Sequence, residues 1–202
     1  MIRALCVAAA LMLSMASLAN AGDSVRERLA KPAVLRGTFE QSRHLQGFHN
    51  PLVSQGDFVV ARDRGVLWET RKPFPSTTVI SKDRVLTRHA DGSSEVVVDT
   101  AHAPAASMAN ALMLAMLGGD LDTLSKSFAL QQSDLPDGTW RLELSPRASG
   151  LAHVFTRIVL QGDRYVRSVH LDEKGGDSTD ITFQSITETP AQLDPAEAKQ
   201  FE

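Results

Sequence analysis

The strongest constraint on the fold is an alternation of apolar and polar residues that recurs in short segments over most of the chain. In the first such segment, Leu35, Gly37 and Phe39 alternate with polar and charged residues. A period of two places successive side chains on opposite faces of a β-strand. Segments of this kind, about ten residues apart and separated by polar turns, predict an antiparallel meander of about eleven strands. They are 34–41, 52–61, 65–70, 77–81, 84–89, 95–99, 128–132, 139–145, 152–160, 165–172 and 178–186.

Helices are predicted where the alternation stops. Residues 23–31 are expected to form a short helix that Asp23 caps and that ends before Pro32. Residues 105–117 contain good helix formers, no charge and no β-branched residue, which predicts a second helix. Gly118-Gly119 should end that helix, and Asp120 should start a third, short one.

The predicted helix 105–117 is apolar on every side, so it must be buried on every side. A strongly curved sheet with this helix in its concave mouth would bury it. Met108, Met113 and Met116 would give the helix a soft, adaptable surface of the kind that accepts variable apolar shapes. For an isolated apolar helix, the simpler interpretation is that these residues complete a core, and periodicity does not distinguish a plug from a lid.

The first 21 residues have the three parts of a secretory signal peptide: a positive charge at Arg3, an apolar stretch, and a small-residue cleavage site that ends at Ala21. The apolar run of roughly 15 residues is shorter than the ~20 that span a bilayer. Cleavage is expected between Ala21 and Gly22. Residues 1–21 would then be a signal peptide, and residues 22–202 a single domain of 181 of the 202 residues.

Composition argues against several other classes of protein. The only cysteine is Cys6, inside the predicted signal peptide, so a mature chain without thiols suits an oxidising periplasm. Removal of Arg3 with the signal peptide leaves 20 basic residues against 24 acidic ones, a poor balance for binding nucleic acid. The sequence lacks the hydrolase nucleophile elbow, the P-loop, the dinucleotide-binding glycine motif and the zinc-protease motif. We therefore expect no catalytic residue, no metal and no cofactor.

Several short motifs occur together in the first half of the chain. They are GTFEQ at 37–41, QGDF at 55–58, Arg62, VLWE at 66–69, KPF at 72–74 and VISKDRVL at 79–86, followed near the end of the chain by DITFQ at 180–184. Their order and spacing resemble those of LolA, the periplasmic carrier of outer-membrane lipoproteins. The resemblance implies an α+β, mainly β, fold: an open, incomplete antiparallel β-barrel of about eleven strands, with short helices covering the concave face.

The resemblance also implies a hydrophobic cavity for acyl chains and a latch that holds the empty cavity closed. Arg62 corresponds to the family arginine whose loop hydrogen-bonds to the helical lid. Asp63 stands where the family commonly has proline, and Val66 replaces an aromatic residue. The implied cavity residues are Phe39, Phe58, Val66 and Trp68 from the strands, and Met108, Leu112, Met113 and Met116 from the predicted lid.

The expected function is that of a periplasmic carrier for acylated cargo, either a lipoprotein or a lipid. Its expected partners are an inner-membrane release complex and an outer-membrane acceptor, and the chain is expected to act as a monomer. Two alternatives remain open at this point. One is a lipid-binding sensor of the envelope, and the other is a dedicated carrier of a glycolipid or another acylated envelope product.

Overall fold

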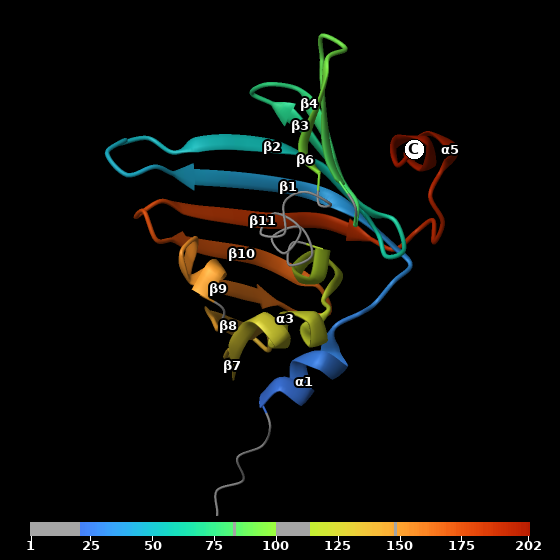
Figure 1. The fold of residues 1–202 in the computed structure, drawn as a ribbon. Helices are drawn as coiled ribbons and strands as arrows, with labels where there is room; N and C mark the ends of the chain where they lie inside the picture. The colour runs from blue at the N-terminus through green and yellow to red at the C-terminus, as the bar shows by residue number, and fades with distance from the viewer. Residues whose placement is uncertain (1–20, 83, 100–113, 148) are drawn as a thin grey trace, which may run out of the picture.

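Eleven strands and several short helices make up the described part of the chain (Figure 1), which in this computed structural model comprises residues 21–82, 84–99, 114–147 and 149–202. The helices are α1 (Ala21–Arg28), α3 (Leu121–Ser127), α4 (Ser149–Ala152) and α5 (Pro195–Gln200), and residues 114–118 are also helical. The strands are β1 (Val34–His44), β2 (Leu52–Ala61), β3 (Gly65–Lys72), β4 (Ser76–Ile80), β5 (Arg84–His89), β6 (Ser94–Asp99), β7 (Phe128–Asp134), β8 (Trp140–Pro146), β9 (Phe155–Gly162), β10 (Val166–Glu173) and β11 (Ser178–Thr187).

The strands form one open sheet in the order β6-β5-β4-β3-β2-β1-β11-β10-β9-β8-β7. Two antiparallel meanders, β1 to β6 and β7 to β11, are joined where β1 pairs with β11, for example at Phe39 and Phe183. In Figure 1 the sheet is strongly twisted, and β4 to β6 turn away from the direction of β1 and β11. The two edges, β6 and β7, do not pair with each other, so the sheet stays unclosed. The predicted open architecture is confirmed.

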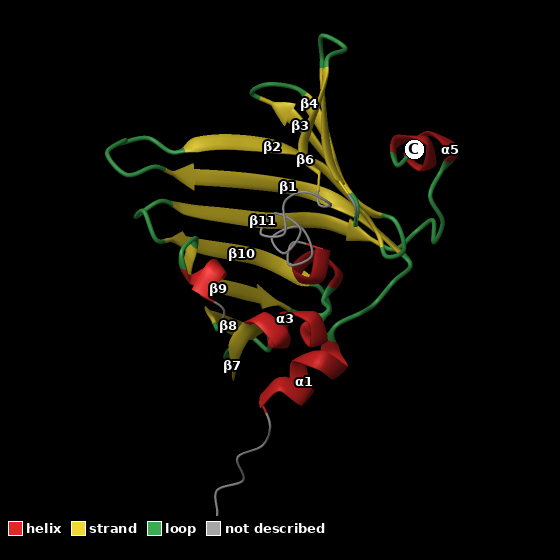
Figure 2. Cartoon of the chain, in the orientation of Figure 1, coloured by secondary structure: helices red, strands yellow, loops and turns green. Residues whose placement is uncertain are grey.

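One face of the sheet, which we call the inner face, carries the core. Paired residues share a face, so the row Leu35, Val60, Val66 and Ile80 runs across β1 to β4 on this side. All four side chains are buried. The helical segments α1, 114–118 and α3 gather at one end of the sheet (Figure 2), and they contribute Val25, Ala115, Leu121 and Leu124 to the same hydrophobic cluster. Because side chains alternate between the two faces of each strand, the apolar side chains of the inner face lie under the helices.

Most predicted strands lie within a few residues of the observed ones, but three local predictions were wrong or incomplete. Helix α1 begins at Ala21, so Asp23 lies inside the helix and does not cap it. Residue 152 belongs to α4, and β9 begins only at Phe155. Helix α5, which has a capping box formed by Asp194 and Glu197, was not anticipated.

The predicted helix 105–117 can be compared with the structure only in its last turn, because residues 100–113 lie outside the described residues. Residues 114–118 are helical, and Gly119 follows with a positive φ of 66°. Asp120 caps α3 as predicted, since its side chain accepts a hydrogen bond from the backbone N–H of Thr123. Among the described residues, no helix is long and apolar enough to cross a membrane.

Candidate lipid-binding pocket

The four strand residues predicted to line a cavity come together on the inner face, but as parts of a closed core. Phe39, Phe58, Val66 and Trp68 are 2%, 2%, 0% and 8% exposed. The rings of Phe39 and Trp68 stack with centroids 3.8 Å apart, and Phe58 meets the ring of Phe183 edge-on at 5.2 Å. Stacked and edge-on contacts of this kind fill space efficiently. None of the four lines the main pocket of the described structure.

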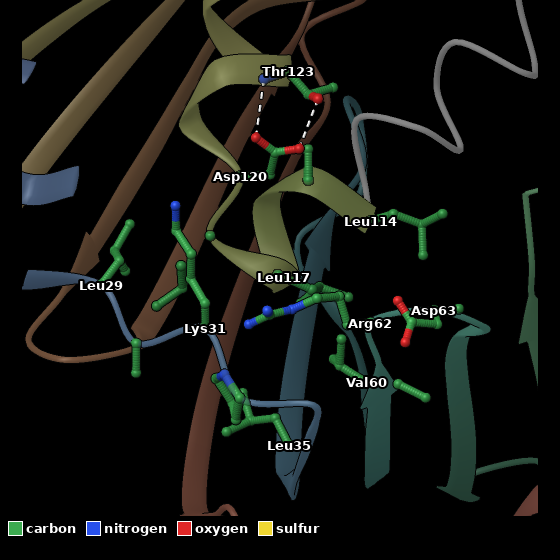
Figure 3. Close-up of a pocket in the computed structure, with 18 of the residues that line it drawn as sticks. Leu29, Lys31, Leu35, Val60, Arg62, Asp63, Leu114, Leu117, Asp120 and Thr123 are labelled. Atoms are coloured by element: carbon green, nitrogen blue, oxygen red, sulfur yellow. Dashed lines mark hydrogen bonds between the residues drawn. The ribbon is translucent and has the colours of Figure 1, made fainter. Parts of the chain in front are cut away.

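That pocket encloses about 500 Å³ at one end of the inner face, where the β2–β3 turn, the α1–β1 connection and residues 114–120 meet (Figure 3). Its apolar walls come from both the sheet and the helices. Leu35, Val60 and Ala61 belong to the sheet side and are buried at the pocket floor. The remaining apolar wall residues include Leu29, Leu114, Leu117 and Val166.

Backbone contacts fix the segments that surround the pocket. The N–H of Arg62 donates to the carbonyl of Ala33 at 3.0 Å, which ties the β2–β3 turn to the α1–β1 connection. The N–H of Ala30 donates to the carbonyl of Arg164 at 2.8 Å, which ties the same connection to the β9–β10 turn. Gly65 closes the β2–β3 turn with a φ of 136°, and a Cβ atom there would lie 2.0 Å from the carbonyl oxygen of Ile80. Only glycine fits this backbone.

Charged residues surround the pocket mouth. Lys31, Arg62, Arg64 and Lys82 are exposed and line it together with Asp63 and Asp120. Burial raises the pKa of Asp120, but hydrogen bonds from the hydroxyl and backbone N–H of Thr123 outweigh this effect and leave the pKa below its ordinary value. Asp120 is therefore negatively charged near neutral pH. Among the described residues, no group of three or more histidine, cysteine or acidic side chains is placed to hold a metal ion.

Arg62, the predicted latch residue, lies at the pocket mouth. Its guanidinium makes no hydrogen bond or ion pair with any described residue, including 114–120. In Figure 3 this group extends toward the Lys31 side of the pocket, whereas the carboxylate of Asp63 lies on the opposite side. The remaining predicted lid residues Met108, Leu112 and Met113 fall outside the described residues, so the latch stays a prediction. Met116 is half-buried and packs against the core.

Sequence reasoning missed most of the pocket walls. Leu35 and Val60 share the inner face with the aromatic residues that were predicted, and they lie nearer the end of their strands. The alternation identifies this face but not the position along it where space is left between sheet and helices. Leu114 and Leu117 belong to the predicted lid helix, one turn apart, and that spacing was the available signal.

Comparisons with known proteins agree with the motifs found in the sequence. The model of the family described as "Outer membrane lipoprotein carrier protein LolA" matches residues 30–199. The outer-membrane lipoprotein carrier protein of Dechloromonas aromatica (strain RCB) is 25% identical over 180 residues, which cover 89% of this chain and 83% of the relative. A solved LolA superfamily protein from Nitrosomonas europaea matches with a TM-score of 0.46 at 8% identity, covering 89% of this chain and 96% of that chain. The MucA/MucB complex of Pseudomonas aeruginosa matches with a TM-score of 0.45 at 18% identity, covering 89% of this chain and 62% of that chain. Because the family match spans most of the sequence, the resemblance seen in the motifs is confirmed, and the chain belongs to the LolA family of outer membrane lipoprotein carrier proteins.

Proposed function

We propose that this chain is a periplasmic carrier that holds the acyl chains of a lipoprotein or lipid and transfers them toward the outer membrane. In this proposal residues 1–21 are removed on export and residues 22–202 act as one carrier domain, without catalytic residues. The observation that supports it best is the apolar pocket of about 500 Å³ between the helical segments and the inner face. This volume falls in the range of roughly 300–1,000 Å³ that small-molecule sites occupy.

Burial of an acyl chain would supply the binding energy. Each methylene group removed from water contributes about 0.8 kcal/mol, so one long chain contributes on the order of 10 kcal/mol. The core beneath the pocket is closed by Phe39 and Trp68. A cargo with several acyl chains would therefore have to displace the segment that includes Leu114 and Leu117. Displacement subtracts from the net affinity, which lets a carrier release its cargo as well as bind it.

The first experiment is native mass spectrometry with lipid extraction on protein purified from the periplasm without detergent. We expect solvent to release bound acyl material and to identify the cargo class, separating lipoprotein from glycolipid. An empty protein that also fails to bind a fluorescent fatty-acyl probe would contradict the carrier function. It would favour an envelope sensor with a filled core.

Leu117→Glu tests whether the pocket is the binding site. A carboxylate on the half-buried pocket wall should weaken binding of the fluorescent acyl probe by about tenfold or more, because an ionised group opposes apolar contact. Val154→Glu is the matched control, since Val154 is 48% exposed and does not line the pocket. Equal probe affinity in the two variants would place the binding site elsewhere.

Arg62→Leu tests the proposed latch. Loss of a hydrogen bond from the guanidinium to the lid should leave binding of a neutral diacyl ligand unchanged or tighter, and should slow its release. The measurement is the transfer rate of a fluorescent acylated peptide to acceptor vesicles. Arg71→Leu is the control, because Arg71 is exposed and pairs with Asp57. A wild-type release rate in Arg62→Leu would rule out the latch.

A further inference from the structure

We propose, building on the carrier function above, that the pocket takes an amphiphile with an anionic head, a phosphate or a carboxylate. The head would bind to the cationic rim, which we define as Lys31, Arg62, Arg64 and Lys82. The acyl tail would enter between the apolar walls below. A carrier without the cationic rim would bind cargo with a neutral head equally well. The rim therefore restricts the expected cargo to amphiphiles with an anionic head.

The rim concentrates positive charge in a chain that is acidic as a whole. The full sequence has 24 acidic residues against 21 lysines and arginines, yet among the described residues four cations and two acids line this pocket. The four cations come from three separate segments: the α1–β1 connection, the β2–β3 turn and the β4–β5 turn. The fold brings these segments to one pocket mouth, and positive charges on a pocket wall favour the binding of an anion there.

Arg62 is the rim residue best placed to bind such an anion. Its guanidinium has no hydrogen bond or ion pair with any described residue, although Figure 3 shows it extending across the pocket. Arg36 on the neighbouring strand is a useful contrast, because its guanidinium binds both carboxylate oxygens of Glu197 and the carbonyls of Pro190 and Gln192. The planar guanidinium of Arg62, without a polar contact to a described residue, has the geometry that matches phosphate and carboxylate.

The two acids at the mouth do not neutralise Arg62. Asp120 is occupied as the cap of α3, where its two oxygens accept from the N–H and the hydroxyl of Thr123 at 3.1 and 2.7 Å. The carboxylate of Asp63 lies on the opposite side from the guanidinium of Arg62 in Figure 3. Lys31 acts electrostatically on Asp120, and one nitrogen of Arg64 donates to the carbonyl of Ala198 at 3.4 Å. Among the rim residues, the guanidinium of Arg62 therefore remains at the mouth, next to the apolar walls, without a polar contact to a described residue.

The test compares two ligands that share a tail and differ only in the charge of the head. Dodecanoate and dodecanol compete with the fluorescent acyl probe on the full mature chain, at neutral pH and low salt. We expect wild type to prefer dodecanoate over dodecanol, and Arg62→Gln to reduce that preference by about tenfold, the contribution of one charge-assisted hydrogen bond. Removal of a latch would change the affinity for both ligands by the same factor, so the ratio reports on head recognition alone.

Two control variants test whether the preference for dodecanoate over dodecanol depends on charge at the pocket mouth. Arg71→Gln removes the same charge at an exposed ion pair outside the pocket and should keep the wild-type preference. Asp63→Asn should increase the preference for dodecanoate by roughly twofold, because it removes a like charge from the mouth. Higher salt should weaken dodecanoate binding and leave dodecanol binding unchanged.

Each outcome decides between the two proposals. Equal affinity for dodecanoate and dodecanol in wild type would overturn head recognition and leave the carrier function intact. Failure of both ligands to displace the probe would contradict the carrier function itself. Titration with inorganic phosphate separates a lipid head from a free anion. Weak phosphate binding that removes only the advantage of dodecanoate supports an amphiphile site, whereas phosphate binding as tight as that of dodecanoate would show a free-anion site and overturn the proposal.

Discussion

At Gly56 on β2 there is no room for even a methyl group. An added Cβ atom would lie 1.8 Å from the carbonyl oxygen of Glu69 and 2.9 Å from the ring of Phe39. We expect Gly56→Ala to lower the free energy of unfolding by at least about 2 kcal/mol, because the backbone of β3 would have to move. Gly150→Ala is the matched control, since nothing lies within 4 Å of its added Cβ. Chemical denaturation of both variants measures the difference, and similar stabilities would contradict the close packing of β2 on β3.

His170 on β10 should make the stability of the protein depend on pH. Its Nδ1 lies 2.6 Å from Asp180 and its Nε2 lies 3.0 Å from Asp172, and these hydrogen bonds raise its pKa above 6.5 despite partial burial. A raised pKa in the folded state stabilises the protein below the unfolded pKa near 6.5, and this stabilisation is lost as pH rises through the folded value.

His170→Gln should remove that contribution. We expect wild type to be more stable than the variant by about 1 kcal/mol or less at pH 6, because the site is partly exposed, and this difference should shrink toward pH 9. Urea denaturation across this pH range gives the comparison. A difference that stayed constant with pH would mean that the imidazole is neutral throughout.

The candidate site was predictable at the level of residue type and face, and less so in position. Phe39 and Trp68 were expected to line a cavity; the period of two places them on the inner face, where they pack in a core and do not line the pocket described above. The pocket walls at Leu35 and Val60 depend on how the helical segments meet the sheet. That contact joins residues far apart in the sequence, and no local pattern encodes it.

At the scale of elements, α5 packs on the outer face of the sheet through charged contacts. The guanidinium of Arg36 donates to both carboxylate oxygens of Glu197, at 2.7 and 2.6 Å, and both side chains are 16% exposed. These hydrogen bonds lower the pKa of Glu197 in spite of its burial. Arg88 on β5 adds a hydrogen bond to the carbonyl of Gln200 at 3.2 Å. Helix α5 spans only six residues, so it depends on these contacts.

Arg36→Met should detach α5 without unfolding the sheet. Hydrogen bonds to charged groups contribute about 1.5–3 kcal/mol each, so amide protection in α5 should fall strongly while protection in β1 to β3 is kept. Hydrogen exchange by mass spectrometry measures both regions. Arg43→Met is the control on the same strand, because its contacts with Glu173 and Asp177 are longer, at 3.5 Å, and more exposed. Unchanged protection of α5 in Arg36→Met would assign its docking to apolar contacts.

The same contact predicts a second pH dependence at the acid end of the range. A carboxylate with a lowered pKa in the folded state stabilises the protein above the unfolded pKa, here near 4.5, and this stabilisation is lost as pH falls through the folded value. We therefore expect α5 to lose amide protection as pH falls below 4.5, earlier than the sheet does. Acid titration monitored by hydrogen exchange would detect it, and simultaneous loss in α5 and the sheet would argue against it.

Strands were easier to predict from the sequence than short helices. Each strand has several alternating residues, and the alternation is a direct consequence of burying one face. Helices α4 and α5 have four and six residues, too few to show a helical period. The signal for α5 was its capping box at Asp194 and Glu197, with Pro195 at the first position. This pattern lies outside every strand, so the alternation used to predict the strands does not reveal it.

At the scale of the whole molecule, the pairing of β1 with β11 could not be derived from alternation. Phe39 and Phe183 are partners although they lie far apart in the sequence. Periodicity determines which residues share a face but leaves the order of strands open. Local hairpins account for the other neighbours in the sheet, which is why their pairing was predictable. The prediction of one continuous meander was wrong at a single point, because β6 and β7 are opposite edges and β1 pairs with β11 instead.

Ligand binding should stabilise the molecule as a whole, because the pocket is built from both meanders and from the helical segments. Val60 belongs to the first meander, Val166 to the second and Leu117 to the helical segment between them. At a ligand concentration one hundred times Kd, the gain is about 2.7 kcal/mol, which corresponds to a rise in Tm of roughly 5–10 °C. Calorimetry with and without an acyl ligand measures it. Leu117→Glu should show a much smaller rise.

In the open sheet the two edge strands, β6 and β7, are not paired with each other, and the polypeptide chain connects them covalently. The backbone leaves the sheet from β6 at Asp99 and re-enters it in β7 at Phe128, at the opposite edge. The intervening residues thus form a covalent strap, and its contour length, at most ~3.3–3.6 Å per residue, limits how far the edges can separate. If the protein is a carrier as proposed, any separation of the two edges has to be accommodated by the chain between Asp99 and Phe128, which includes Leu114. Lengthening or shortening this strap should change the largest cargo that the protein admits, without touching a single residue of the pocket wall.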